Sequence, residues 1–294
     1  MRQSVGPIIA LIVILLVGVF GYRALFSSTG PELRVLRVVG RVERRAAQLG
    51  PTALVAGDLL DLQDSVQVGD DGELSVAVGE EAELRLRSGT TVTITEVGER
   101  GLRLELEQGR VTARVRRGGA GVGVGAGPRA ARLTEGEANI GRDASDLFTV
   151  EAVEGEVAVD GAPGHGALGP GEALVVSGEG GVVEAHLAEA LLLELLLPEA
   201  RDEQGRVSII AHTSPFSMVR VRGEGAPLAE DGGPLTLRAN GEGELRLPPM
   251  VVPPKGLDLV LDATDPFGRT VSQRQRVEPP PGPELSGSEV RWAP

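Results

Sequence analysis

The chain has 294 residues and a net charge of −13, with no Cys, 42 Gly, and one Trp, one Tyr and five Phe as its aromatic residues. The negative charge argues against a nucleic-acid partner, because the phosphates would be repelled. The absence of Cys excludes disulfides, thiolate metal sites and a Cys nucleophile, while the length suffices for two domains with cores of their own.

The first segment of the chain is strongly apolar. No charged residue lies between Arg2 and Arg23, and residues 8–20 are nearly all Ile, Leu and Val. About 20 residues are needed to cross a bilayer as a helix, so the segment predicts a transmembrane anchor over residues 7–26, after a short cytoplasmic tail at 1–6. A buried soluble helix would show a polar face, which this segment lacks.

A cleaved signal peptide is the alternative to an anchor, because Ser28-Thr29-Gly30 has the small-x-small pattern of a cleavage site. The cut would fall ten residues beyond the apolar core and directly before Pro31, which is a poor position for a peptidase. We therefore expect an anchor that is not cleaved.

Apolar and polar residues alternate over residues 83–115, which is the spacing of β-strands with one buried face. Residues that favour turns separate the runs at Ser88-Gly89, at 98–101 and at Gln108-Gly109. The pattern predicts a meander of short strands. Its core residues would be Leu84, Leu86, Val92, Ile94, Leu102, Leu104, Leu106, Val111, Ala113 and Val115.

The same alternation recurs at residues 74–78, 147–153, 156–159 and 173–176, and Asp70-Asp71-Gly72 is a hairpin signal before the first of these runs. A Gly-x-Val unit recurs at Gly40, Gly109 and Gly155, which we interpret as turn glycines that enter strands. Such repetition favours a layered β roll in which similar strand pairs stack.

The order of several short motifs resembles the FecR domain. They are Gly40-x-Val42, Leu54-x-x-Gly57-Asp58, the meander, Leu106-Glu107-Gln108-Gly109-Arg110-Val111, Val153-x-Gly155-x-Val157 and Leu168-Gly169-Pro170-Gly171-Glu172-Ala173. The match covers roughly residues 34–178. The resemblance implies an all-β domain, which we place at residues 31–184, that lies outside the inner membrane and relays or scaffolds without catalysis. It also implies a single-pass topology with the N-terminus in the cytoplasm and the bulk of the chain in the periplasm.

One segment departs from the family pattern. The family usually has Gly-Thr-x-Phe before its late strands, and this chain has Gly136-Glu137-Ala138-Asn139-Ile140, so a partner surface that depends on that segment would differ here. The best-known relatives are anti-sigma regulators with a cytoplasmic helical domain. Only six residues precede Pro7, so we expect no anti-sigma domain in this chain.

Seven short runs of strand-like sequence predict an immunoglobulin-like β-sandwich over residues 188–278. The first run, within 185–197, is rich in Ala, Leu and Glu and also suits a helix, but its short length and Pro198 favour a strand. The others lie at 207–211, 218–222, 235–238, 244–247, 257–262 and 270–277.

Within this region, Asn240-Gly241 predicts a type I′ hairpin turn. Residues 257–268 resemble the late strands of bacterial immunoglobulin-like domains. The final segment, 279–294, is rich in Pro and Gly and is expected to be a disordered tail.

One glycine-rich stretch, Gly121–Ala126, fits the loose form of a dinucleotide-binding loop. That function needs a following helix whose amides hold a pyrophosphate, and Pro128 and the residues after it offer no such helix. We therefore expect a glycine-rich strand or loop.

The remaining candidates are histidines and carboxylates. His165, His186 and His212 lack the close spacing of metal ligands. Asp262 and Asp265 are too few for a calcium site, which takes 6 to 8 oxygen ligands, and are expected to be solvated turn carboxylates. The sequence therefore predicts no catalytic, cofactor-binding or metal-binding residue, and no cofactor.

These observations predict a membrane-anchored periplasmic module that is not an enzyme and that binds an envelope protein in a sensing or scaffold role. The alternative is a module that binds cell-envelope glycan such as peptidoglycan. Sugar-binding faces usually present aromatic side chains, and the single Trp, Trp292, lies in the predicted tail, so the composition favours a protein partner.

Overall fold

The computed structural model describes residues 30–46, 50–99, 101–164, 166–178, 181–186, 191, 193–197, 202, 206–223, 225–229 and 232–279. All the regular structure in these ranges is β-strand, so the predicted all-β class is confirmed. No helix in this part of the chain is long and apolar enough to cross a bilayer. The predicted anchor at 7–26, the tail before it, and the predicted C-terminal tail beyond Pro279 lie outside the described residues.

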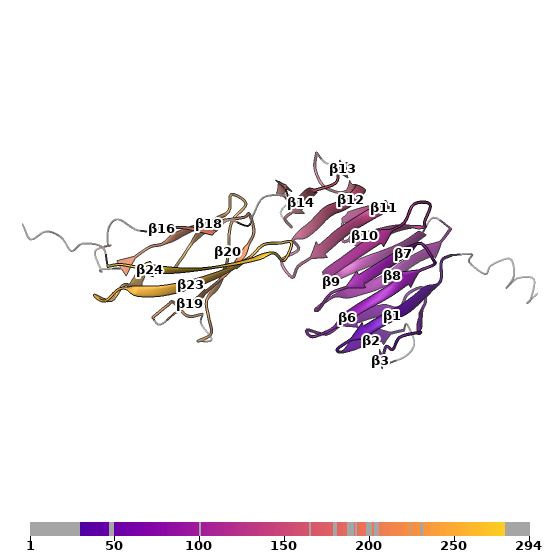
Figure 1. Ribbon diagram of the computed structural model, residues 1–294, viewed down its shortest axis with the longest axis horizontal. Helices are drawn as coiled ribbons and strands as arrows, with labels where there is room; N and C mark the ends of the chain where they lie inside the picture. Colours follow the sequence, from indigo (N-terminus) through magenta and orange to yellow (C-terminus); the bar gives the residue numbers. More distant parts are fainter. Residues whose placement is uncertain are drawn as a thin grey trace, which may run out of the picture. The chain divides into compact units, whose positions relative to one another are not determined.

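The strands divide between two compact units (Figure 1). The first unit consists of the described residues up to Arg142 together with Ala152–Pro170, and the second of Asp143–Glu151 and the described residues from Gly171 on. The first contains β1 (Leu33–Val39), β2 (Val42–Arg45), β3 (Thr52–Ala53), β4 (Leu59–Leu60), β5 (Ser65–Val68), β6 (Glu73–Val78), β7 (Ala82–Leu86), β8 (Thr91–Gly98), β9 (Gly101–Val115), β10 (Gly121–Ala126), β11 (Arg129–Arg142) and β13 (Ala167–Leu168).

The second unit contains β14 (Glu172–Val176), β15 (Val182–His186), β16 (Leu193–Leu196), β17 (Arg206–Val207), β18 (Ile210–Thr213), β19 (Met218–Arg222), β20 (Thr236–Arg238), β21 (Glu244–Arg246), β22 (Met250–Val251), β23 (Leu257–Thr264) and β24 (Thr270–Val277). One strand, β12 (Phe148–Asp160), begins in the second unit and ends in the first. The strand β16 confirms the strand interpretation for the described part of the segment that also suited a helix.

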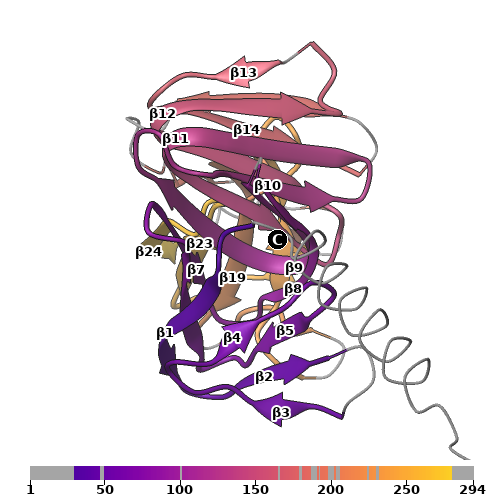
Figure 2. The same cartoon turned by 90° about the vertical axis from the view of Figure 1, so that its right-hand side faces the viewer.

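Two hydrogen-bonded rows of strands in the first unit share β9. One row is β4-β1-β6-β7-β9 and the other is β3-β2-β5-β8-β9. In Figure 2, β3 lies at one end of the stack of strands and β13 at the other. The first half of β9 pairs with β8 and its second half with β7, so this strand passes from one row to the other. The ten core residues predicted within 83–115 are all at most 3% exposed, which confirms the alternation.

Glycines let the long strands change direction without ending. Gly109 in β9, Gly136 in β11 and Gly155 in β12 have φ values of +98°, +112° and +79°, in the left-handed region that other residues rarely adopt. A Cβ at Gly136 would overlap the backbone carbonyl oxygen of Glu154 in β12. The interpretation of Gly109 and Gly155 as turn residues is therefore wrong, whereas Gly40 does lie between β1 and β2.

The predicted meander is right in one connection and wrong in two. The turn at 98–101 joins β8 and β9 as an antiparallel hairpin, as predicted. Strands β7 and β8 do not pair with each other but both pair with β9, so Ser88-Gly89 links the two rows and Gln108-Gly109 lies inside β9. Asp70-Asp71-Gly72 likewise connects β5, which pairs with β2 and β8, to β6, which pairs with β1 and β7. The turns at Ser88-Gly89 and Asp70-Asp71-Gly72 therefore lead from one row to the other and do not make hairpins.

The second unit has its own aliphatic core. Its sheets include β16-β18-β21 and β20-β19-β23-β24, together with the pair β17-β22. Val219 and Val221 of β19, Leu259 and Leu261 of β23, and Ala211 of β18 belong to one cluster of buried residues and are at most 1% exposed. The core thus joins side chains from two sheets.

The Asn240-Gly241 turn is not the predicted hairpin. Strand β20 pairs with β19 and β21 pairs with β18, so the turn carries the chain from one sheet to another. The Asn240 Oδ1 atom accepts the backbone N–H groups of Glu242 and Glu244 at 3.0 and 2.8 Å. The left-handed conformation falls on Gly243, with φ +80°, whereas a type I′ turn would need it at both Asn240 and Gly241.

Candidate functional site

The carboxylate of Asp265 is a buried part of a turn, which corrects the expectation that it is solvated. The residue is 3% exposed. Its Oδ1 atom accepts the backbone N–H groups of Phe267 and Arg269 at 3.0 and 2.7 Å, and its Oδ2 atom accepts the Arg269 Nε–H at 2.6 Å. These three N–H donors bind one carboxylate and so stabilise the turn between β23 and β24, which gives Asp265 a structural role.

Asp262 also has partners within the protein. Its Oδ1 atom accepts the Ser272 hydroxyl at 2.8 Å, and its Oδ2 atom forms an ion pair with Arg222 at 2.5 Å. The described residues contain no group of three or more His, Asp or Glu side chains placed to hold a metal ion. Asp262 and Asp265 are therefore bound to different basic side chains and are not assembled into one site.

The structure does not bring the histidines together in the part it describes. His165 and the side chain of His186 lie outside the described residues. His212 lies in β18, where its Cα partners on the neighbouring strands are Glu194 and Glu244. His212 is therefore the cross-strand neighbour of two acidic residues.

The glycine-rich stretch forms the strand β10, which confirms the simpler interpretation. It pairs in parallel with β9 and antiparallel with β11, and the chain continues into β11 at Arg129 without an intervening helix. There is thus no helix N-terminus here to hold a pyrophosphate. The glycines border a depression of about 240 Å³, whose charged lining includes Arg103, Arg132 and Asp160.

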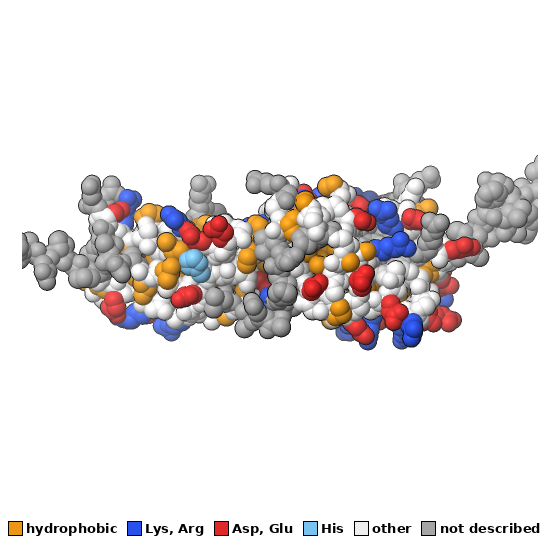
Figure 3. Space-filling model, turned by 90° about the horizontal axis from the view of Figure 1, so that it is seen from above, with side chains coloured by type: hydrophobic (Ala, Val, Ile, Leu, Met, Phe, Trp, Pro, Cys, Tyr) orange, Lys and Arg blue, Asp and Glu red, His pale blue; other side chains and the backbone are white. Residues whose placement is uncertain are grey.

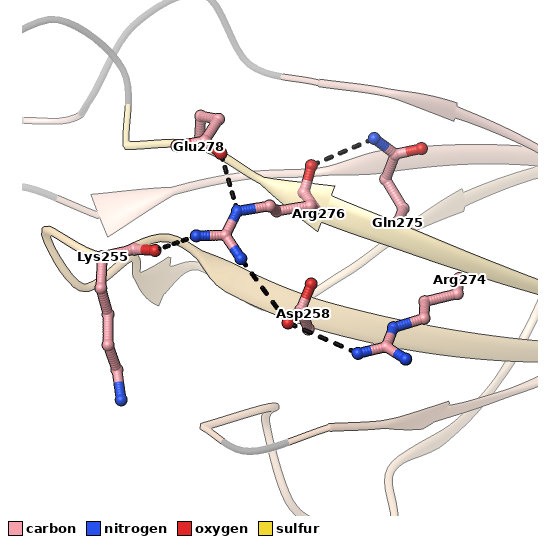
Figure 4. A network of polar contacts seen from close by, with 6 residues as sticks. All are labelled: Lys255, Asp258, Arg274, Gln275, Arg276 and Glu278. Carbon is pink, nitrogen blue, oxygen red and sulfur yellow. Dashed lines mark hydrogen bonds and ion pairs between the residues drawn. The ribbon is translucent and has the colours of Figure 1, made fainter.

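An exposed arginine cluster lies at one end of the β23–β24 pair (Figure 4). The Arg276 Nε–H donates to Glu278 at 2.8 Å, and another nitrogen of the guanidinium donates to the Lys255 carbonyl oxygen. The hydrogen bond and charge of Glu278, and then the charge of Asp258, raise the pKa of Arg276. Asp258 also lies 3.6 Å from Arg274, so neighbouring acids already neutralise this cluster.

A more open feature is a polar row across four strands of the first unit. Glu43 in β2, Gln67 in β5, Thr91 in β8 and Gln108 in β9 are successive Cα partners across the sheet. We call these four residues the polar row. At about 4.8 Å per strand, the row is roughly 14 Å long.

The polar row is the floor of an open groove. All four residues line both of two adjoining depressions, of about 340 and 450 Å³. Arg45, Ser65 and Glu107 are among the further residues of the first depression, and Arg41, Asp70 and Asp71 of the second. Acidic and basic side chains are also interspersed over the face of the molecule that Figure 3 shows.

Two members of the polar row have groups that no described residue binds. Glu43 accepts the Arg41 Nε–H at 2.8 Å, and Gln108 donates to the Gly89 carbonyl oxygen at 3.3 Å. Within the described residues, the Gln67 amide and the Thr91 hydroxyl make no hydrogen bond. The middle of the row therefore presents donors and acceptors to solvent on a rigid sheet. Sequence separation hides this site, because its members come from four different strands.

Comparison with known proteins gives a limited match. No family model and no curated protein matches the chain. Two crystal structures of a protein from Parabacteroides distasonis ATCC 8503, described as a "putative anti-sigma factor" and determined at 2.50 and 1.65 Å resolution, are similar to part of it. Each has 21% sequence identity and a TM-score of 0.37, and the match covers 42% of this chain and 59% of that chain. The similarity is therefore partial on both sides.

Proposed function

We propose that this chain is a membrane-anchored module of the bacterial cell envelope that binds another protein and does not catalyse a reaction. In this proposal the first unit is a FecR-like β roll and the second an immunoglobulin-like β-sandwich. The apolar run at residues 8–20 supports the anchor. The order of the FecR-like motifs supports a periplasmic position and a sensing or scaffold role.

The polar row is the observation that carries the proposal of a protein partner. Its floor offers an amide and a hydroxyl that no described residue binds, and its rim has both acidic and basic side chains. A polypeptide matches this pattern, because its backbone supplies donors and acceptors and its side chains supply charges of both signs. The groove crosses strands whose inner faces are buried, so its shape is held by the core.

A glycan is the second candidate ligand, because amides and hydroxyls such as those of Gln67, Thr91 and Gln108 also bind sugar hydroxyls. Sugar rings usually stack on aromatic side chains, and the residues that line the two depressions include no aromatic residue. The lining therefore favours a protein over peptidoglycan.

A site-specific photo-crosslinker tests the proposal in the full chain. At Ser65, which lines the groove but is not in the polar row, it should capture one discrete protein in native envelopes. At Arg85, an exposed residue of β7 that does not line the groove, it should not. The captured protein should be lost when Thr91→Ala is added, because the floor then lacks its hydroxyl. Crosslinks that follow the sacculus and are released by a muramidase would show that the ligand is glycan and would overturn the proposal.

A further inference from the structure

Four large apolar side chains are exposed at one edge of the first unit. Leu36, Val55, Leu59 and Leu62 are 49%, 60%, 47% and 53% exposed. We call these four residues the edge patch. Isolated apolar residues on a surface need no explanation, but neighbouring ones mark a surface that contacts something apolar.

Hydrogen bonding within the sheet brings three members of the edge patch together. Strand β4 lies beside β1 (Figure 2), and Leu59 in β4 is the Cα partner of Arg34, which is two residues before Leu36. The next stretch of chain is attached to β1 as well: the Val35 N–H donates to the Asp58 carbonyl oxygen, and the Gly57 N–H donates to the Val35 carbonyl oxygen. Val55 begins this turn. Leu62 is two residues beyond β4, where the N–H of the next residue, Gln63, donates to the Ile94 carbonyl oxygen in β8, so Leu62 lies at the periphery of the patch.

The edge patch lies close in the chain to the proposed anchor. The predicted transmembrane segment ends at residue 26, and Arg34 is eight residues further on. Eight extended residues reach at most about 29 Å, so the Cα atom of Arg34 cannot lie farther than this from the end of the anchor, and its partner Leu59 lies about one strand spacing of 4.8 Å from Arg34. A bilayer would always be within reach of the edge patch, whereas a second copy of the chain would have to be recruited.

We propose that the edge patch contacts the surface of the bilayer and orients the first unit on the membrane. This inference rests on the membrane anchor of the proposed function. Leu and Val side chains suit the boundary between headgroups and acyl chains. Four side chains form a smaller surface than the roughly 800 Å² that each partner contributes to a stable protein interface, so the patch suits a bilayer better than a second copy.

The arginines around the patch indicate which lipids matter. Arg44 donates to the Leu59 carbonyl oxygen at 2.9 Å and lies 3.6 Å from Asp64, and Arg34 forms an ion pair with Glu32 at 2.6 Å. These two guanidinium groups are paired with carboxylates, so their attraction to anionic headgroups is reduced. Arg37, which follows Leu36, is exposed and forms no ion pair within the described residues, so it adds an attraction to anionic headgroups. The contact is therefore mainly apolar, and anionic lipid should strengthen it only modestly.

The absence of Cys makes a direct test possible, because one introduced Cys can carry a single fluorescent label. The full chain with Leu59→Cys is reconstituted at one copy per lipid nanodisc, with lipids that carry a quencher in their acyl chains. The matched control is Val153→Cys, an equally exposed apolar position at 43% in β12. It is five strand spacings, about 24 Å, from β1 along the order β1-β6-β7-β9-β11-β12.

We expect quenching at position 59 to be at least about threefold stronger than at position 153, and to rise only modestly from neutral to partly anionic discs. Equal quenching at the two positions in a chain that co-purifies with discs would overturn this inference and leave the anchor intact. A chain that does not co-purify with discs would overturn the anchor itself. Shielding of the label at position 59 that appears only with two copies per disc would show that the patch pairs two chains and would also overturn the inference.

Discussion

Replacing Gly136 by Ala tests whether the long strands depend on glycine where they change direction. Gly136 combines a left-handed φ of +112° with a Cβ position that overlaps the Glu154 carbonyl oxygen. The conformation alone costs an Ala residue about 1–2 kcal/mol. The overlap is with backbone in the neighbouring strand, so β11 and β12 must also move apart, and we expect a total loss above about 3 kcal/mol.

Two other glycines separate these contributions. Gly89 has φ +69° but nothing within 4 Å of its Cβ position, so Gly89→Ala should cost only the conformational part, about 1–2 kcal/mol. Gly98 has open space and no left-handed φ, so Gly98→Ala should change stability by less than about 0.5 kcal/mol.

The assay for this series is the thermal midpoint of the full chain in detergent, followed by far-ultraviolet circular dichroism. At roughly 2–4 °C per kcal/mol for a unit of this size, Gly136→Ala should lower the midpoint by at least about 6 °C and Gly89→Ala by about 2–8 °C. Because the same conversion applies to both variants, the midpoint should fall at least about 2 °C further for Gly136→Ala than for Gly89→Ala, and equal losses would refute the close packing of β11 against β12. An unchanged midpoint for both would refute the role of left-handed glycines altogether.

Three further predictions concern the second unit. Gly243→Ala should cost more than about 2 kcal/mol in chemical denaturation, because φ is +80° and the new Cβ would overlap the Thr213 carbonyl oxygen. Gly241→Ala should be nearly neutral. A larger loss of stability for Gly241→Ala than for Gly243→Ala would instead support a type I′ turn. Asp265→Asn should cost about 3 kcal/mol and Asp262→Asn clearly less, since only Asp265 is buried with three donors; similar losses would contradict the turn role. Arg276→Ala should leave the thermal midpoint unchanged within error, since its ion pairs are exposed, and a clear drop would contradict this.

The buried faces of the strands could be predicted from the sequence, because burial follows a two-residue period that needs no knowledge of the partner strand. Leu84 and Leu86 alternate with charged residues and are 2% exposed. The two-residue period does not reveal the buried face of β11, because Ala131 and Ala138 occupy buried positions and Gly136 interrupts the alternation. Ala buries little apolar area, so its position in an alternating pattern is a weak signal.

Strand partners could not be predicted, because a turn residue reports local backbone conformation and nothing more. Asn240 stabilises a turn by accepting two backbone N–H groups, and this works equally well when the next strand joins another sheet. The same holds for Ser88-Gly89, which leads from one row of the first unit to the other. In a fold built from two rows that share a strand, a connection between rows needs a tight turn as much as a hairpin does.

The polar row could not be predicted for the same reason, because it depends on which strands pair and in which register. Glu43, Gln67, Thr91 and Gln108 are separated by about 15 to 25 residues each, and nothing in any one segment distinguishes them from other solvent-facing positions of a strand. Only the register that pairs β2 with β5, β5 with β8, and β8 with β9 places them side by side. A shift of one residue in any of these pairs would turn one strand's member toward the core, so the groove exists only in this register. The apolar residues that alternate with the row, such as Val66 and Val92, hold that register, and the same core that stabilises the first unit therefore also defines its candidate binding surface.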